Sequence, residues 1–172
     1  MSKLEKIFIR DAQINDLKAI IEIYNSTVPG RIVTADTEPV SIASRKRWFY
    51  EHSSDFRPLW VAIKDEEIVG WLSFQSFYGR PAYNKTAELS IYIAEGFRKK
   101  GIGQLLLKKA LDESPRLKIN NLLGFIFGHN IASLNLFYKF GFVSWGVFPG
   151  VAEIDGVERD LVIVGKRVVN LI

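Results

Sequence analysis

The pattern of apolar and polar residues changes period repeatedly along the chain, and it predicts alternating strands and helices. Short apolar runs bounded by turn residues are typical of strands. Such runs occur at residues 7–12, 58–64, 67–77, 86–94, 121–127, 141–148 and 159–168. Apolar positions three or four residues apart predict helices near residues 14–24, 41–49, 105–111 and 132–140. This alternation predicts an α/β fold with a mixed sheet and helices on both faces.

Polar residues are expected to begin the first two of these helices. Asn15 can cap the first helix, and Ser41 precedes the second. The stretch between them, residues 26–41, is rich in turn residues and is predicted to be a loop. No internal repeat or linker interrupts the chain. We therefore expect a single domain over residues 1–172.

The composition narrows the classes of function. The chain has 172 residues, 48% of them apolar and 24% charged, which is typical of a globular protein with a sizeable core. It has no cysteine, so disulfides, thiolate zinc sites and cysteine nucleophiles are excluded, and with only two histidines no metal site is expected. No signal peptide or membrane span is evident, so we expect a cytoplasmic protein. The net charge of +4 favours an anionic partner, either nucleic acid or a phosphorylated cofactor.

The sequence FRKKGIGQ, residues 97–104, has the features of an anion-binding loop. It fails as a P-loop because Ile102 and Gly103 stand where Lys and Ser/Thr should follow, and as a dinucleotide fingerprint because Leu106 occupies the third small position. It does lie between a predicted strand and a predicted helix, where free backbone N–H groups and the helix dipole favour an anion. Gly101 and Gly103 would let an anion approach the backbone. The alternative is a solvated basic turn.

Two motifs in the central part of the chain together resemble the GNAT N-acetyltransferase superfamily. Arg98-x-x-Gly101-x-Gly103 resembles its acetyl-CoA pyrophosphate loop, and NIASLNLFYKFGF, residues 130–142, resembles its second motif. The segments YNSTV, TADTEPV, RPAYNKTAELSIYIAE and GVERDLVIVGKR are similar to the phosphinothricin (methionine sulfoximine) N-acetyltransferase family. This resemblance implies a mostly antiparallel sheet splayed at its centre, with acetyl-CoA in the gap. It also implies a homodimer that acetylates the α-amino group of glutamate- or methionine-like compounds.

The resemblance implies a set of residues that bind acetyl-CoA. The backbone of the strand after Glu88 would pair with the pantetheine arm, the loop and helix start would hold the pyrophosphate, and the helix near residue 130 would supply further contacts. These residues are Ile91, Tyr92, Ile93, Arg98, Lys99, Lys100, Gly101, Ile102, Gly103, Gln104, Asn130 and Ser133. Asn130 has a second interpretation as a helix N-cap, and the two roles are compatible.

Acetyl transfer to an amine needs a deprotonated amine, because an ordinary amine of pKa about 8 to 10 is mostly charged at neutral pH. Glu88 matches the family's strand glutamate and is the predicted general base, acting directly or through a water; the alternative is a glutamate facing solvent. Tyr138 matches the tyrosine that protonates the departing thiolate, and its alternative is a core residue. His129 is interpreted as structural.

A carboxylate on the acceptor would be bound best by arginine. Arg31 and Arg80 lie in loops expected near the acceptor, and Tyr83 is expected to close the pocket; surface positions are the alternative for each. The closing segment departs from the family, because Glu158 and Arg159 rather than an aromatic residue precede Asp160.

Two other functions remain open from the residues. An acetyltransferase of the same fold would act instead on a peptide N-terminus, a polyamine or an aminoglycoside, although cationic acceptors would prefer an acidic pocket. A non-enzymatic nucleic-acid-binding module is the third hypothesis, and the modest charge and the lack of a basic-aromatic motif argue against it.

Overall fold

The structure of the protein is a computed structural model, which describes residues 7–168. Residues 1–6, part of the segment weighed as a signal peptide, and residues 169–172 of the predicted domain lie outside the described residues. The strands form a mixed, seven-stranded sheet in the order β1-β2-β3-β4-β5-β7-β6. Their bounds are β1 Phe8–Asp11, β2 Leu59–Lys64, β3 Glu67–Ser76, β4 Thr86–Ile93, β5 Asn121–Phe127, β6 Val143–Ile154 and β7 Val157–Arg167.

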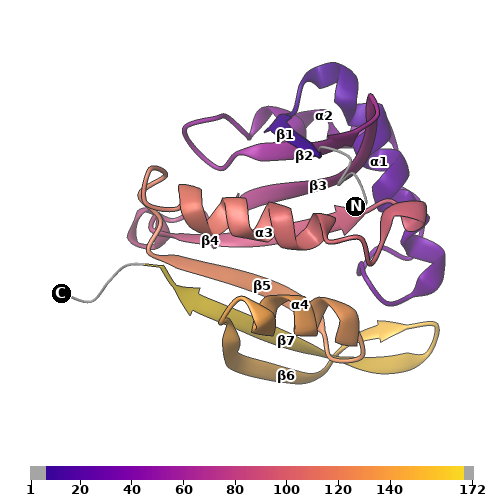
Figure 1. The fold of residues 1–172 in the computed structure, drawn as a ribbon. Helices are drawn as coiled ribbons and strands as arrows, with labels where there is room; N and C mark the ends of the chain where they lie inside the picture. Colours follow the sequence, from indigo (N-terminus) through magenta and orange to yellow (C-terminus); the bar gives the residue numbers. More distant parts are fainter. Residues whose placement is uncertain (1–6, 169–172) are drawn as a thin grey trace, which may run out of the picture.

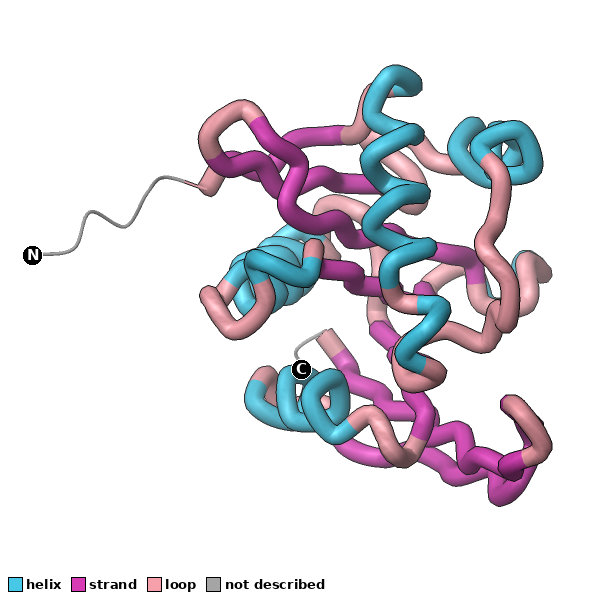
Figure 2. Tube along the Cα trace, turned by 90° about the vertical axis from the view of Figure 1, so that its right-hand side faces the viewer, coloured by secondary structure: helices cyan, strands magenta, loops and turns pink. Residues whose placement is uncertain are grey.

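Helices cover both faces of this sheet, as the sequence predicts. Figure 2 shows the two helical layers on opposite sides of the strands, with α1 and α2 on one side and α3 and α4 on the other. The helices are α1 Leu17–Ser26, α2 Ile42–Tyr50, α3 Ile102–Glu113 and α4 Ile131–Lys139. Short 3-10 turns occupy Ile14–Asp16, Val28–Gly30, Pro81–Tyr83 and Glu95–Phe97.

The side chains of β4 alternate between two separate cores. Ala87 and Leu89 are buried in the larger core, which also contains the apolar faces of α3 and α4. The next residues along the strand point to the opposite face. There Tyr92 packs against the smaller core, which Trp71 and α1 help to form. One strand therefore supports both layers of the molecule (Figure 1).

The pairing between β4 and β5 is short, and it is the parallel pair of this sheet. Only Thr86, Ala87 and Glu88 pair with β5, opposite residues 121–123. On its other edge, β4 pairs with β3 as far as Ile93. Beyond Glu88 the two central strands therefore separate, which confirms the expected splayed sheet.

Two details differ from the sequence predictions. Asn15 does not cap the first helix: it lies inside the 3-10 turn, and Asp16 accepts a hydrogen bond from the backbone N–H of Gln13 at 2.7 Å instead. The strand predicted to end at Phe148 continues to Ile154. It is an edge strand, so Pro149 needs no sheet partner for a missing N–H.

Replacing Asn130 with alanine should destabilise the fold. Its side chain accepts a hydrogen bond from the backbone N–H of Ser133 at 3.2 Å and so caps α4. We expect the free energy of unfolding in urea to fall by about 1 kcal/mol. The control is Asn135→Ala on the exposed side of the same helix, which should change it by less than about 0.5 kcal/mol. Equal losses in the two variants would contradict the capping role.

Candidate active site

Glu88 lies where β4 and β5 begin to separate, and a cavity of about 390 Å³ opens beside it. We call this the central cavity. Its walls come from β4, β5, the β6–β7 hairpin and the loop before α2. The lining residues are Val33, Thr34, Ala35, Glu88, Ser90, Tyr92, Phe125, Phe127, Val151, Ala152 and Leu161. Most are apolar, so Glu88 is a carboxylate in a largely non-polar cavity.

Burial raises the pKa of Glu88 from its ordinary value of 4.5 to about 7. The cause is desolvation, which disfavours the charged form of a carboxylate. A carboxyl group with this pKa exchanges its proton near neutral pH and is suited to general acid–base chemistry. Glu88 pairs with Gln75 of β3 and with Leu123 of β5, so its backbone is fixed on both sides.

The predicted anion-binding loop leads directly into α3, a helix of 12 residues. Gly101 is in the left-handed conformation with φ +81°, which favours glycine, and an added Cβ there would meet open space. The first intrahelical backbone bond runs from Leu105 N–H to Gly101 O at 3.1 Å. The N–H groups of the three residues before Leu105 are therefore the free donors expected at a helix start.

Charged side chains flank this helix start. Arg98, Lys99 and Lys100 are exposed. Arg98 Nε donates to the carbonyl of Ile93 at 3.3 Å, which ties the loop to the end of β4. The side-chain oxygen of Gln104 accepts from Lys139 of α4 at 2.8 Å. An uncrowded turn, free N–H groups and adjacent cations form a suitable site for a pyrophosphate.

The strand and helix on either side of the central separation carry the other predicted cofactor residues. Ile91, Tyr92 and Ile93 lie on the part of β4 that has no partner in β5. The ring of Tyr92 stacks on Trp71, with centroids 4.5 Å apart, and lines the central cavity. Across the gap, Asn130 is buried at the start of α4. Tyr138, near the end of α4, is 42% exposed and so is not a core residue.

The predicted acceptor-binding residues fall on two segments: Arg80 and Tyr83 share one 3-10 turn, where the backbone N–H of Tyr83 donates to the carbonyl of Arg80 at 2.9 Å, and Arg31 lies in the loop before α2. Arg31 Nε donates to Asp155 in the β6–β7 turn at 2.8 Å, and its Nη1 donates to the carbonyl of Thr37 at 2.6 Å. Arg80 is exposed at the start of a 3-10 turn. Neither arginine lines the two cavities described for residues 7–168.

Tyr83 is connected to the central cavity through a chain of aromatic rings. It contacts Phe77 with centroids 5.5 Å apart, and Phe77 stacks with Phe125 of the cavity wall at 6.5 Å.

His129 is bonded through Nε2 to the carbonyl of Arg31 at 2.9 Å, and its ring stacks on Phe127. It therefore joins the loop before α2 to the end of β5.

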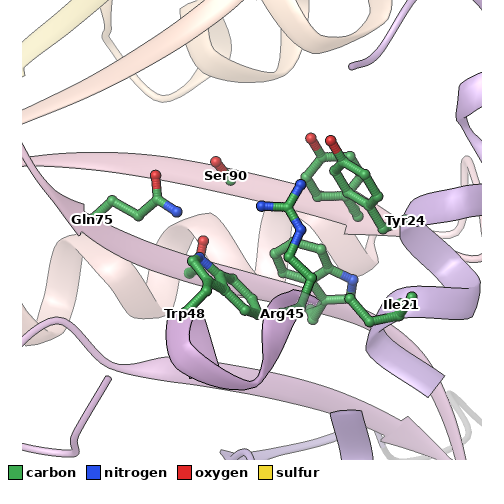
Figure 3. Close-up of a pocket in the computed structure, with 9 residues that line it drawn as sticks. Ile21, Tyr24, Arg45, Trp48, Gln75 and Ser90 are labelled. Carbon is green, nitrogen blue, oxygen red and sulfur yellow. The ribbon is translucent and has the colours of Figure 1, made fainter. Parts of the chain in front are cut away.

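The sequence reasoning missed a second cavity, of about 210 Å³, which we call the α2 cavity. It lies between α2 and the strands β3 and β4, and Figure 3 shows Arg45 extending into it from α2. The lining residues are Ile21, Tyr24, Arg45, Trp48, Trp71, Ser73, Gln75, Ser90 and Tyr92. The strand periodicity could have found part of this set, because Ser90 and Tyr92 follow Glu88 at steps of two.

An ionic cluster holds the loop before α2 against the two helices beside this cavity. Arg45 Nη2 donates to Asp36 at 2.9 Å. The hydroxyl of Tyr24 donates to Asp36 and also contacts the hydroxyl of Thr34. Burial raises the pKa of Tyr24 to about 12, so this hydroxyl stays protonated as a donor. Thr34 in turn lines the central cavity.

Within residues 7–168, no group of three or more His, Cys, Asp or Glu side chains is placed to hold a metal ion. No helix in that range has the length and apolar character needed to cross a bilayer.

Comparisons with known proteins agree with this geometry. The Acetyltransferase (GNAT) family profile matches residues 17–142. YwnH of Bacillus subtilis (strain 168), named as a putative phosphinothricin acetyltransferase, is 55% identical over 92% of this chain and 98% of its own. The L-methionine sulfoximine/L-methionine sulfone acetyltransferase of Pseudomonas paraeruginosa is 30% identical over 89% of this chain and 90% of its own.

A solved structure has the same fold with acetyl-CoA bound. It is the phosphinothricin acetyltransferase (Pat) of Sinorhizobium meliloti in complex with AcCoA. It matches with a TM-score of 0.88 and 27% identity over 94% of this chain and 88% of its own. The chain belongs to the GNAT acetyltransferase family. It is therefore an acetyltransferase, as its sequence predicts.

The raised pKa of Glu88 predicts a pH-dependent cost to stability. Between pH 4.5 and 7 the unfolded chain has lost the Glu88 proton while the folded protein keeps it, so stability falls as pH rises through this window. The cost reaches about 3 kcal/mol above pH 7. Glu88→Gln should remove this cost, so urea unfolding should show the variant gaining stability over the wild type between pH 5 and pH 8. A constant difference would contradict the shift.

Proposed function

We propose that this acetyltransferase transfers the acetyl group of acetyl-CoA to the α-amino group of a small amino-acid-like acceptor, by direct attack with both substrates bound. The observation that carries the proposal is the Glu88 carboxyl group, with its pKa near 7, at the point where the central strands separate. The central cavity beside it has a volume suited to a small molecule rather than to a protein chain.

The residues of this chain fit acetyl-CoA. Gly101 leaves open space at the start of α3, and the N–H groups of the first turn with Arg98, Lys99 and Lys100 would hold the pyrophosphate. The edge of β4 from Ile91 to Ile93 would bind the pantetheine arm by backbone hydrogen bonds, with Asn130 and Ser133 on the facing helix. When bound, the thioester supplies the electrophilic carbonyl and the leaving group.

Glu88 in its carboxylate form would accept a proton from the acceptor ammonium, directly or through a water, and so produce the neutral amine that attacks. A backbone N–H of the Ile91–Ile93 segment would polarise the carbonyl under attack. Tyr138 would donate a proton to the departing sulfur. Its exposure on α4 is compatible with that role.

The acceptor and its surroundings are inferred from the relatives' names and from the cavity. Arg80 and Tyr83 lie on the loop between β3 and β4, and the ring contacts of Tyr83 through Phe77 to Phe125 support a place for this loop beside the acceptor. Arg31 would need to leave Asp155 before it could bind a carboxylate.

We further propose a cytoplasmic homodimer with no nucleic-acid or membrane partner. Exposed Trp145, Val147 and Phe148 on the edge strand β6 support the homodimer.

Glu88→Gln should lower kcat by about 10²- to 10⁴-fold at pH 7. Wild-type kcat/KM should rise with pH with a midpoint near 7, because the ionised carboxylate is the active base. The variant should lack the rise near pH 7. Its activity should recover partly only at higher pH, where the free amine is abundant. Turnover would be measured by thiol release from acetyl-CoA.

The assay for this variant should use a panel of amines. Methionine sulfoximine, phosphinothricin and other amino acids represent the proposed acceptors, and a peptide N-terminus, a polyamine and an aminoglycoside represent other classes. Calorimetry should show unchanged acetyl-CoA affinity in Glu88→Gln. Equal turnover of the two proteins from pH 6 to 9 would refute the assignment of the base.

Gly101→Val should weaken acetyl-CoA binding at least about tenfold, because a β-branched residue opposes the left-handed backbone and intrudes on the pyrophosphate site. The control is a donor without phosphates, the thioester of N-acetylcysteamine. Its kcat/KM should be nearly the same in wild type and variant. A comparable loss with both donors would show that the loop acts on the fold and not on the pyrophosphate.

A further inference from the structure

Arg57, in the loop before β2, is a buried cation whose hydrogen-bond partners are neutral. The residue is only 3% exposed, and its guanidinium lies over the ring of Phe56, 4.5 Å from the centroid. Nε and Nη2 donate to hydroxyl and carbonyl oxygens, whereas Nη1 has no hydrogen-bond partner in the described structure. Desolvation lowers the pKa of Arg57, and a buried charge without a carboxylate beside it destabilises the folded state.

The backbone of Arg57 is strained as well. Its φ of +53° is in the left-handed region, which is unfavourable for a residue that has a Cβ. Arg57 also precedes Pro58, and a residue before proline prefers an extended backbone. The carbonyl of Pro58 accepts from the N–H of Phe74 at 2.9 Å, so this segment is anchored to β3. Strain that persists in a fold often marks a functional position.

The hydrogen bonds of Arg57 join the two ends of the loop between β3 and β4, residues 77–85, which we call the β3–β4 loop. Nε donates to the hydroxyl of Ser76, at the end of β3, at 3.1 Å. Nη2 donates to the carbonyls of Asn84 at 2.9 Å and Thr86 at 3.3 Å, on the β4 side. One planar guanidinium therefore bridges the base of the loop.

The β3–β4 loop carries residues that the proposed function places beside the acceptor. Arg80 and Tyr83 share its 3-10 turn, and the ring contacts of Tyr83 lead through Phe77 to Phe125 of the central cavity. The tip of the loop is open to solvent, since Tyr78 is 77% exposed. The position of the tip therefore depends on how the base of the loop is held.

We propose that Arg57 is a positioning residue for acceptor recognition: by fixing the base of the β3–β4 loop, it holds Arg80 and Tyr83 beside the central cavity. This inference rests on the proposed function, because it assumes that the acceptor lies in that cavity. Arg57 lines neither of the two cavities described for residues 7–168, so it acts through the loop and not by contact with a substrate. Its buried charge and strained backbone then give the loop one defined position.

The first test is Arg57→Met, which keeps an unbranched side chain and removes the hydrogen bonds. With L-methionine sulfoximine as acceptor, the KM for the acceptor should rise about tenfold, because hydrogen bonds from a charged group are lost at the base of the loop. kcat and the KM for acetyl-CoA should each change by less than about threefold, since only acceptor binding is weakened.

A second measurement needs no substrate. The N–H groups of Tyr83 and Asn84 donate to the carbonyls of Arg80 and Pro81 inside the β3–β4 loop. Their hydrogen–deuterium exchange should be faster in Arg57→Met by on the order of tenfold, while exchange in α3 stays unchanged. A general loss of stability would raise exchange in both places.

Arg116→Met is the matched control. Arg116 also anchors the loop before β2, because it donates to the carbonyl of Ser54 at 3.1 Å and to Asp55 at 3.4 Å. Its Nε donates to Glu113 of α3 at 2.6 Å, so it holds this loop to a helix and not to the β3–β4 loop. Both KM values, kcat and the exchange of residues 77–85 should stay near those of the wild type.

Arg57→Lys is the conservative variant. A single ammonium cannot bridge both ends of the loop as a planar fork does, so the acceptor KM and the loop exchange should lie between those of the wild type and Arg57→Met. A thermal melt would verify folding. If Arg57→Met does not fold, Arg57→Lys carries the test with the same two measurements.

Each outcome has a distinct meaning. A selective rise in acceptor KM with faster exchange in the β3–β4 loop, absent in Arg116→Met, supports the positioning role. An unchanged acceptor KM, unchanged loop exchange, or equal rises in both KM values overturns that role and leaves the proposed function standing. If the wild type acetylates no amino acid in the panel, the proposed function fails, and the role of Arg57 in acceptor recognition fails with it.

Discussion

The separation of β4 from β5 is the constraint on which the rest of the structure depends. After Glu88, β4 is held by β3 alone, and the edge that faces β5 is left without a strand partner. Unpaired strand edges are normally covered or avoided because their backbone groups seek hydrogen bonds. Here the edge lies inside the molecule, flanked by α3 and α4, and under the proposed function it would bind the extended pantetheine arm. The fold leaves one row of backbone bonds unmade at its centre.

The same separation explains the state of Glu88. It sits at the last paired position, where the backbone is still fixed by both neighbours while the side chain faces a largely apolar cavity. A carboxylate in this position lacks the water that would stabilise its charge, and its pKa rises to about 7. The folded protein loses stability at neutral pH as a result, and under the proposed function it gains a base matched to an amine substrate. Stability and reactivity here oppose each other through one side chain.

Features set by local sequence could be predicted, while those set by tertiary contacts could not. The strands, the helices and the glycine turn at Gly101 follow from periodicity and backbone preference, and their positions differ little from the structure. The seven strands agree with the seven apolar runs, and the splayed centre agrees with the resemblance. The partners of the arginines could not be predicted from the sequence. Arg31 is bound to Asp155, 124 residues away in sequence, whereas Arg45 faces a cavity. Nothing in the order of residues indicates that Ser73 would be buried without a partner.

The alternation of β4 has a consequence for how such an enzyme can diverge. Ala87 and Leu89 belong to the core of α3 and α4, which under the proposed function carries the cofactor-binding elements, whereas Glu88, Ser90 and Tyr92 line the central cavity and the last two also line the α2 cavity. Substitutions on the two faces share few neighbours, so their effects on stability should be nearly additive. Under the proposed function, mutations can therefore accumulate on the α1–α2 side and change the accepted amine while the donor side stays intact. A strand that serves two cores lets one half of a bisubstrate site evolve independently of the other.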